Sequence, residues 1–301
     1  MNQLRELSTF GIGGQADLLV QVSGADEAAF HLGKLRDEGL PVTFLGGGSN
    51  VLISDAGVRG AVVRFHGGQI TRETSHVVRV EAGVTVNGLV RWCIGHGLGG
   101  FETWAGTPGT LGGAVYGNAH FQGRLMSEVV TRACLLNRLG QVIVDSVEKL
   151  GFAYDVSRLQ TSGEALLWVE IRVHEDDPVA LRARAKDSLT FRKRTQPLSL
   201  PSAGCIFQNP EPERHLLPEN APCSAGALID RVGLKGERRG GARISPVHAN
   251  FFVNEGGATA SDVVWLIDEA RRRVRETFGI ELREEIVRLG HFGDGASSRG
   301  N

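Results

Sequence analysis

Two glycine-rich runs contain the residues best suited to hold an anionic ligand. Residues 46–50 read Gly-Gly-Gly-Ser-Asn, and residues 106–118 contain five glycines in thirteen positions. Each glycine costs about 0.5–1 kcal/mol relative to alanine in a helix or strand, so a compensating contact is expected. Successive glycine N–H groups can converge on an anion, although the shorter run alone is equally typical of a tight turn. Together the two runs predict loops that hold a diphosphate-containing cofactor.

Cys205 is the residue most open to a chemical role, because it stands between a glycine and an apolar pair in the run 201–210. A lone cysteine is most often a small buried apolar residue. Neither a helix N-terminus nor a basic cluster is predicted beside it, so the pattern does not favour a reactive thiolate. If Cys205 does chemistry, a proton donor is therefore a better prediction than a nucleophile.

Two neighbouring carboxylates, Glu284 and Glu285, lie near the start of the predicted strand 282–289. Side chains alternate along a strand, so one of the two is expected to face inward, although such charge pairs are usually solvated. The histidines show no HExxH motif or other ligand spacing, and the four cysteines show no CxxC spacing. The sequence therefore predicts neither a metal site nor a disulfide framework.

Length and composition indicate a globular protein. The 301 residues suffice for about two domains. The net charge of −1 offers no basic excess for a nucleic-acid backbone. The chain has no apolar run near the roughly 20 residues that span a membrane, and its first residues do not resemble a signal peptide. A reducing, cytoplasmic setting is expected.

Apolar periodicity predicts the elements that position these residues. Strands are expected at 16–22, 41–45, 51–54, 60–65, 77–82, 129–136, 141–146 and 166–174, the sixth and seventh as a hairpin. Helices are expected at 25–38, 86–96 and 179–194, with Pro178 in the first turn of the last. The run 46–50 thus follows directly from a strand, and 106–118 is interpreted as a packed, ligand-contacting loop.

A proline-rich stretch places a domain boundary near 185–200. Beyond it, the clearest prediction is a helix over 262–278, with Ser261 as its N-cap and Gly279 as its stop. The strand 282–289 is expected to end the folded part. The tail 291–301 is predicted to be disordered.

Nine ordered blocks resemble the UDP-N-acetylenolpyruvoylglucosamine reductases, flavoenzymes of bacterial peptidoglycan precursor synthesis. The blocks are 8–14, 45–50, 106–118, 152–154, 195–197, 202–210, 225–230, 248–251 and 285–286. They cover nearly the whole chain except the tail. No tyrosine-bearing insertion precedes residue 195, which is similar to the shorter, type II branch of the family.

The resemblance implies that NADPH delivers a hydride to a bound FAD. The enolpyruvyl sugar nucleotide then takes that hydride at its vinyl methylene carbon, and a proton reaches the carbon beside the carboxylate. Cys205 stands where the family has a proton-donating serine, and a thiol is more acidic than an alcohol. Glu285 matches a glutamate that acts, with an arginine, on the substrate carboxylate and the developing enolate.

The resemblance also assigns ligand-binding residues. Tyr154 and Asn209 match positions that contact the substrate. The residues matching the FAD-binding positions are Gly46, Gly47, Gly48, Ser49, Asn50, Thr107, Pro108, Gly109, Gly112, Gly113, Ala114, Gly117 and Asn118.

Several positions depart from the family pattern. Asp155 stands where a catalytic arginine is expected, and His120, Gln208 and Arg283 replace a glycine, a lysine and a glutamate. An acid cannot stabilise an enolate by charge, so Arg158 or a more distant arginine would have to substitute for the missing one. The alternatives are a non-catalytic or altered FAD-binding paralogue and, less well matched, an oxidase on the same fold.

The implied architecture is α+β, with a two-lobed FAD-binding region of the PCMH type followed by a smaller α+β substrate-binding domain. The expected boundaries are 1–190 for the first region, with lobes of about 1–67 and 68–190, and 191–290 for the second. The expected partner is a small sugar nucleotide. Neither nucleic acid nor membrane is expected to bind, and a monomer is expected.

Overall fold

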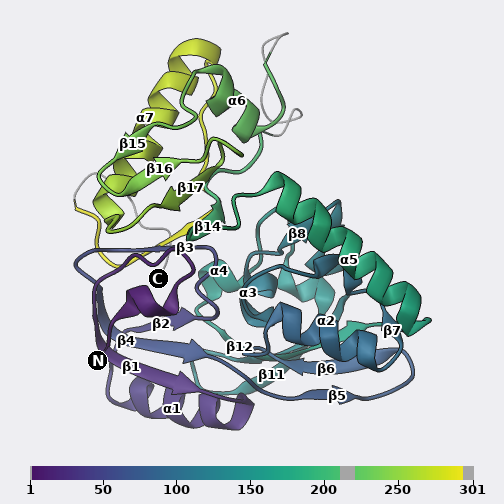
Figure 1. Cartoon of the computed structure of the whole chain (residues 1–301). Coiled ribbons are helices and arrows are strands. Elements are labelled where there is room, and N and C mark those ends of the chain that lie inside the picture. The colour runs from purple at the N-terminus through teal and green to yellow at the C-terminus, as the bar shows by residue number, and fades with distance from the viewer. Residues whose placement is uncertain (1, 211–220, 294–301) are drawn as a thin grey trace. The chain divides into compact units, whose positions relative to one another are not determined.

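The computed structural model describes residues 2–210 and 221–293 (Figure 1). Contacts divide the chain into two compact units. The larger unit contains residues 17–47 and 59–192, and the smaller unit contains the described residues of 2–16, 48–58 and 193–293. Among the described residues, no helix has both the length and the apolar character needed to cross a membrane.

The larger unit is built on two sheets. One has the strand order β1-β4-β2 and the other the order β11-β10-β12-β6-β5. The strands of these sheets are β1 (Ala16–Val22), β2 (Val42–Leu45), β4 (Val58–Phe65), β5 (Ile70–Arg72), β6 (Val77–Glu81), β10 (Val130–Leu136), β11 (Val142–Ser146) and β12 (Ala165–Arg172). Two short antiparallel pairs join β7 (Leu98–Gly99) to β13 (His174–Glu175) and β8 (His120–Phe121) to β9 (Arg124–Leu125).

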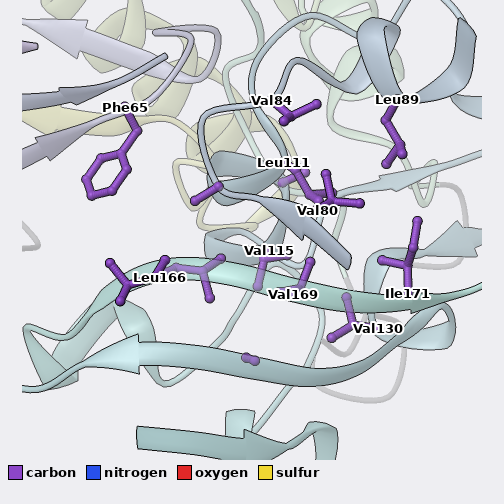
Figure 2. Packing of buried hydrophobic residues seen from close by; sticks show 14 of the residues in the cluster. Phe65, Val80, Val84, Leu89, Leu111, Val115, Val130, Leu166, Val169 and Ile171 are labelled. Carbon is purple, nitrogen blue, oxygen red and sulfur yellow. The ribbon is translucent and has the colours of Figure 1, made fainter. Parts of the chain in front are cut away.

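Helices complete the larger unit. They are α1 (Ala25–Asp37), α2 (Val86–Gly95), α3 (Leu111–Tyr116), α4 (Leu159–Ser162) and α5 (Pro178–Thr195). Their apolar faces and the inward side chains of the strands form one buried cluster (Figure 2). Val169 on β12, Leu89 on α2 and Leu111 on α3 are each completely buried in it. Burial of these branched side chains is what holds the helices to the sheet.

The smaller unit has its own core. An antiparallel sheet in the order β14-β17-β16-β15 is made by β14 (Ser202–Cys205), β15 (Arg238–Arg239), β16 (Ala242–Ile244) and β17 (Phe251–Asn254). Helix α7 (Ala260–Phe278) packs on β15 and β16, and α6 (Ala225–Arg231) packs on α7. The N-terminal arm contributes Phe10 and Ile12 to this core. A parallel pair links β3 (Val51–Ile53) to β18 (Val287–Leu289).

Most predicted elements are confirmed, and the mixture of helices with mainly antiparallel sheets confirms the α+β class. The hairpin between β10 and β11 forms as predicted, with Gly140 in the left-handed region at φ 78°. The prediction that Pro178 opens a helix is also confirmed. The domain boundaries stay a prediction about which regions bind cofactor and substrate. Residues 294–301 of the predicted disordered tail lie outside the described residues.

The predicted N-cap of the long C-terminal helix was wrong. Ser261 lies inside α7, and Thr259 is the N-cap. The Thr259 hydroxyl accepts a hydrogen bond from the Asp262 N–H, and the Asp262 carboxylate accepts one from the Thr259 N–H. This reciprocal capping box satisfies two N–H groups that the helix leaves unpaired, so it outcompetes a single serine cap. Gly279 ends the helix at φ 69°, as predicted.

Two further predictions need correction. Residues 111–116 of the glycine-rich run form the short helix α3 rather than loop, because Thr110 caps its first turn. The predicted strand 282–289 is a strand only over Val287–Leu289, and Glu284 makes an isolated bridge with Phe207. Apolar periodicity could not predict the structure of these two segments, because a short apolar run is compatible with either a helix or a strand.

Candidate active site

Gly46 and Gly47, the first two residues of the shorter glycine-rich run, meet the longer run in the larger unit. A Cβ on Gly46 would collide with the Thr110 hydroxyl, and a Cβ on Gly47 would lie 2.6 Å from the Gly109 Cα. The Gly47 and Gly109 backbones therefore lie too close for a side chain at Gly47, and the Thr110 side chain fills the space beside Gly46. The sequence predicted that these glycines lie against a ligand, whereas the structure shows Gly46 and Gly47 in contact with the 109–110 loop of the protein itself. The contact brings Gly46, Gly47 and Gly109 into one cradle.

The donor groups of both runs fit a diphosphate-bearing cofactor such as FAD. The Gly48 carbonyl accepts from the Thr9 N–H at 3.0 Å, and the Gly109 carbonyl accepts from the Val86 N–H at 3.1 Å. In a trans peptide the N–H points away from the C=O, so the N–H groups of Ser49 and Thr110 point away from those partners. Neither run contains an acidic residue, so no fixed negative charge opposes a phosphate.

The remaining predicted cofactor positions surround α3. Gly112 donates to the Ala82 carbonyl at 2.8 Å, and a Cβ there would meet Ala82 at 3.0 Å. Ala114 is buried in the core, while Gly113 is exposed at the start of the helix. Gly117 is the C-cap, and Pro108 precedes the helix in the loop. The sequence did not single out the buried Arg192, whose guanidinium reaches the Thr107 hydroxyl at 3.5 Å.

Gly47→Ala is expected to lower the amount of flavin that remains bound to the purified protein, because the added methyl group pushes the two loops apart. Flavin absorbance per polypeptide measures this directly. Gly33→Ala in α1 is the matched control, since a Cβ there meets nothing within 4 Å in the described chain. That variant should keep its flavin and gain up to about 1 kcal/mol of helix stability. Equal flavin content in both variants would contradict the cradle.

Cys205 lies at the end of β14, opposite Phe251 of β17. The pairing between β14 and β17 is irregular between Ser202 and Cys205, and Gly204 adopts φ 80° there. Bulges of this kind re-aim a side chain at a functional site. Cys205 is half-buried, whereas Cys93 is buried in the core. Burial raises the pKa of the Cys93 thiol to about 12. All four cysteines are described, and none forms a disulfide.

Glu285 lies beside the Cys205 segment in the smaller unit. Its N–H donates to the Ile206 carbonyl at 2.8 Å, and its carbonyl accepts from the Asn50 side chain at 3.1 Å. The structure thus brings Asn50, Cys205 and Glu285 onto adjacent segments. The Glu284 carboxylate is instead held by Arg271 at 2.9 Å and by the buried Arg288 at 2.7 Å. Glu284 therefore forms an ion pair with a buried arginine.

Asn209 has a structural role as well as its predicted contact with substrate. Its Oδ1 accepts from the Ala225 N–H at 3.0 Å, next to the Ser224 cap of α6. This bond ties the Cys205 segment to α6. The substrate contact stays a prediction.

Tyr154 and Asp155 form the corner of a tight turn in the larger unit. The backbones of Ala153 and Val156 exchange hydrogen bonds of 3.0 and 3.1 Å across it. Asn118, a predicted cofactor residue, donates to the Ala153 carbonyl at 2.9 Å. The structure therefore joins the end of the glycine-rich run to the predicted substrate residue Tyr154. It also places His120 against both corner residues, a contact that sequence spacing did not predict.

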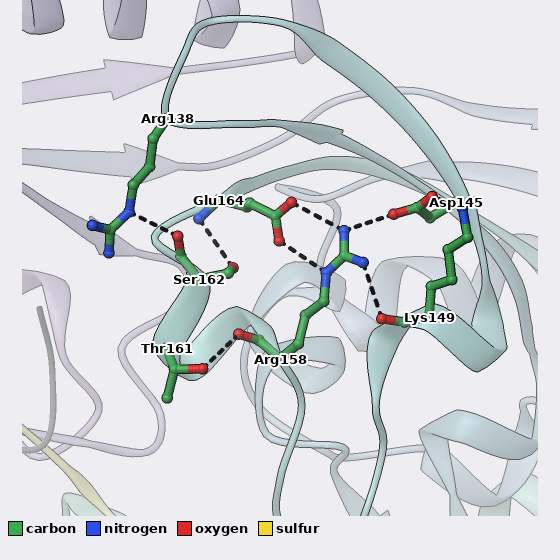
Figure 3. A network of polar contacts seen from close by, with 7 residues as sticks. All are labelled: Arg138, Asp145, Lys149, Arg158, Thr161, Ser162 and Glu164. Atoms are coloured by element: carbon green, nitrogen blue, oxygen red, sulfur yellow. Dashed lines mark hydrogen bonds and ion pairs between the residues drawn. The ribbon is translucent and has the colours of Figure 1, made fainter.

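Arg158 is already engaged by two carboxylates and does not replace the missing arginine (Figure 3). Its guanidinium donates to Glu164 at 2.9 Å and to Asp145 at 2.7 Å. It also donates to the Lys149 carbonyl at 3.0 Å. These bonds use its donors within a local network, so Arg158 serves stability here.

Arg158→Ala is expected to lower the free energy of unfolding by about 2–3 kcal/mol at neutral pH, because it leaves two largely buried carboxylates without their shared cation. The bond from Lys149, and then that from Arg158, hold the pKa of Asp145 below its ordinary value. A depressed carboxyl pKa stabilises the fold above the unfolded pKa, and this stability is lost as pH falls through the folded pKa. The difference between variant and wild type should therefore shrink below roughly pH 4.

Urea unfolding at neutral and acidic pH measures this difference. Arg138→Ala is the control, since Arg138 donates to the Ser162 carbonyl at the surface and its loss should cost less than about 0.5 kcal/mol. A loss in Arg158→Ala that does not change with pH would contradict the assigned role.

Comparison with known proteins identifies the family. Residues 16–146 match the FAD binding domain family. Residues 196–289 match the C-terminal domain family of UDP-N-acetylenolpyruvoylglucosamine reductase. These two matches cover the segments that hold all of the predicted cofactor residues and both predicted catalytic residues.

Whole-length relatives agree. The UDP-N-acetylenolpyruvoylglucosamine reductase of Anaeromyxobacter dehalogenans (strain 2CP-C) is 42% identical over 285 residues, covering 93% of this chain and 82% of that protein. That of Bacillus subtilis (strain 168) is 36% identical, covering 94% and 91%. The crystal structure of the Thermus caldophilus reductase superposes with a TM-score of 0.77 at 34% identity, over 95% of this chain and 97% of that one. The chain therefore belongs to the UDP-N-acetylenolpyruvoylglucosamine reductase family, which confirms the resemblance and the FAD-binding α+β fold expected from the sequence.

Proposed function

We propose that Cys205 and Glu285 carry the proton and charge chemistry of the reaction that defines this family. The chain is an FAD- and NADPH-dependent oxidoreductase of peptidoglycan precursor synthesis. It reduces UDP-N-acetylglucosamine enolpyruvate to UDP-N-acetylmuramate. The observation that supports the assigned roles is the joining of the Cys205 and Glu285 segments through Ile206.

The residues proposed to hold FAD would give it the hydride chemistry of the family, which links NADPH oxidation to reduction of the substrate at its vinyl methylene carbon. The adjacent carbon, next to the carboxylate, then needs one proton. Cys205 is half-buried at an irregular strand end, so its thiol can donate that proton and regain it from solvent. The Glu285 N–H and carbonyl are both hydrogen-bonded, to Ile206 and to Asn50. These two bonds fix the position of the Glu285 backbone beside the Cys205 segment.

The glycine cradle and the residues around α3 are proposed to hold FAD. The supporting observation is the close contact of Gly46 and Gly47 with the 109–110 loop, which leaves no space for a side chain at either glycine. Tyr154 and Asn209 are proposed to bind the sugar nucleotide. We further propose a cytoplasmic monomer that binds no nucleic acid, since both reactants are water-soluble metabolites and the net charge is −1.

The alternative of a non-catalytic paralogue is not favoured, because relatives that match nearly the whole chain are named as reductases. The test follows the flavin through two half-reactions. Purified protein should be yellow, NADPH should bleach it, and the enolpyruvyl sugar nucleotide should restore the colour without oxygen. Protein that is bleached by NADPH but not reoxidised by the sugar nucleotide would contradict the proposed function.

A further inference from the structure

Thr9 in the N-terminal arm joins two segments of the smaller unit that are 39 and 193 residues away in the chain. Its N–H donates to the Gly48 carbonyl at 3.0 Å, and its carbonyl accepts from the Ser202 N–H at 3.1 Å. Its hydroxyl donates to the Ser202 carbonyl at 2.7 Å and lies 3.4 Å from the Gly48 carbonyl. One residue therefore ties the strand that leads to Cys205 to the shorter glycine-rich run.

The N-terminal arm is packed firmly on both sides of Thr9. Before it, the Leu7 carbonyl lies so close to Gly48 that a Cβ on Gly48 would collide with it. Gly48 adopts φ 63°, a left-handed conformation that favours glycine. After it, Phe10 and Ile12 are buried in the core of the smaller unit. These contacts fix the backbone of Thr9, so its side chain starts from a defined position.

Thr9 binds the edge strand of its sheet at the start of an irregular stretch. Between its pairs at Ser202 and Cys205, β14 contains one residue more than the segment of β17 that it faces. A bulge of this kind interrupts the regular ladder of hydrogen bonds and re-aims the side chains beside it. Thr9 anchors the start of the bulge, and the Asn250 carbonyl, which accepts from the Ile206 N–H at 2.8 Å, anchors its end.

The hydroxyl is the part of Thr9 that depends on its residue type. Any residue with a backbone N–H could make the two main-chain bonds, whereas the bond to the Ser202 carbonyl needs a side-chain donor. The branched Cβ of threonine also restricts rotation about χ1, which holds the hydroxyl in one direction. With this bond, both the N–H and the carbonyl of Ser202 are paired with Thr9.

We propose that Thr9 is a positioning residue for the reaction, whose hydroxyl fixes the start of the β14 bulge and thereby sets where the Cys205 thiol lies relative to residues 48–50. The proposal rests on the proposed function, in which Cys205 supplies the proton. Thr9 itself transfers no atom. A displacement of about 1 Å in a reacting group can lower the rate by roughly 100-fold, so a distant bond that fixes the bulge can matter to the chemistry.

Thr9→Val tests the proposal, because it removes the hydroxyl and retains the branched shape and both main-chain bonds. Reoxidation of the reduced flavin by the sugar nucleotide should slow by roughly 10–100-fold. Reduction by NADPH should stay within about threefold of wild type, and the amount of bound flavin should not change. Thr9→Ser retains a hydroxyl and should reoxidise within about threefold of wild type.

Thr131→Val is the matched control. The Thr131 hydroxyl donates to the Glu170 carbonyl at 3.1 Å in the larger unit, and Thr131 is half-buried like Thr9. The two valine variants therefore lose the same kind of bond, and both should unfold at a similarly lowered urea concentration. Thr131→Val should resemble wild type in both half-reactions.

A second readout asks whether Thr9 acts through Cys205. In Cys205→Ala protein, adding Thr9→Val should slow reoxidation by less than about twofold, because the group that Thr9 positions is already gone. A merely structural role would instead give the same slowing in both backgrounds, since the effects of independent sites on the activation free energy add.

The outcomes separate this proposal from the function on which it rests. Reoxidation within about threefold of wild type in Thr9→Val would overturn the proposal and leave the function intact. Equal slowing of both half-reactions, the same slowing with and without Cys205, or unfolding of Thr9→Val alone among the valine variants would also overturn it. Wild-type protein that the sugar nucleotide cannot reoxidise would overturn the proposed function as well.

Discussion

Cys205→Ala is expected to slow reoxidation of the reduced flavin by the enolpyruvyl sugar nucleotide by roughly 10²–10⁴-fold, the usual contribution of a positioned proton donor. Flavin reduction by NADPH should stay within about threefold of wild type, because no proton is delivered to the substrate in that step. Rapid mixing without oxygen, followed by flavin absorbance, measures the two steps separately. Equal loss in both would argue against a proton-donor role.

The conservative substitution makes this test sharper. Cys205→Ser replaces the thiol by a hydroxyl, which can also donate a proton, so this variant should recover part of the reoxidation rate that alanine loses. Cys223→Ala is the control, because Cys223 is exposed and outside the Cys205 segment. Activity that is equal in the serine and alanine variants would indicate that the residue packs rather than donates.

Asn250→Ala is expected to lower the free energy of unfolding by roughly 2–5 kcal/mol, because two buried backbone groups lose the side chain to which they are hydrogen-bonded. The Asn250 side chain is 2% exposed. It accepts from the Phe207 N–H at 2.9 Å and donates to the Phe207 carbonyl at 2.7 Å. Its own carbonyl accepts from the Ile206 N–H at 2.8 Å, so the residue holds the chain directly after Cys205.

The same substitution should slow flavin reoxidation more than flavin reduction, since it loosens the Cys205 segment. Urea unfolding and the two half-reactions measure the two effects. Asn137→Ala is the control: its Oδ1 accepts from the Leu139 and Gln141 N–H groups in an exposed turn, where water can replace it. Its loss should cost about 1 kcal/mol or less. If both variants lose equal stability, burial is not the source of the effect.

The cofactor loops show how far sequence reasoning reached. Two glycine-rich runs following regular elements were sufficient to predict a pair of loops for a diphosphate cofactor, and the FAD binding domain match confirms the cofactor. The reason given for the glycines was incomplete. Gly46 and Gly47 are required by the approach of the 109–110 loop, 62 or more residues away, and that approach exists only after folding.

The candidate site shows the opposite limit. Spacing could nominate Arg158 as a substitute cation, because it stands three residues from Asp155. In the folded protein its guanidinium is instead bonded to the carboxylates of Asp145 and Glu164, and these bonds keep it from acting at a distant site. The same fold sets His120 against Asp155, a pairing that no local period encodes.

By itself, the sequence determined the family, the FAD and NADPH requirement and the α+β class, because these depend on local blocks in order along the chain. Tertiary structure alone decided that Glu284 pairs with Arg271 and Arg288, that Arg158 is engaged by Asp145 and Glu164, and that His120 and Asp155 form one pair. The physical reason is that charge and hydrogen-bond partners are chosen by proximity in space. Residues far apart in the chain compete for those partners only once the strands and turns that carry them have packed.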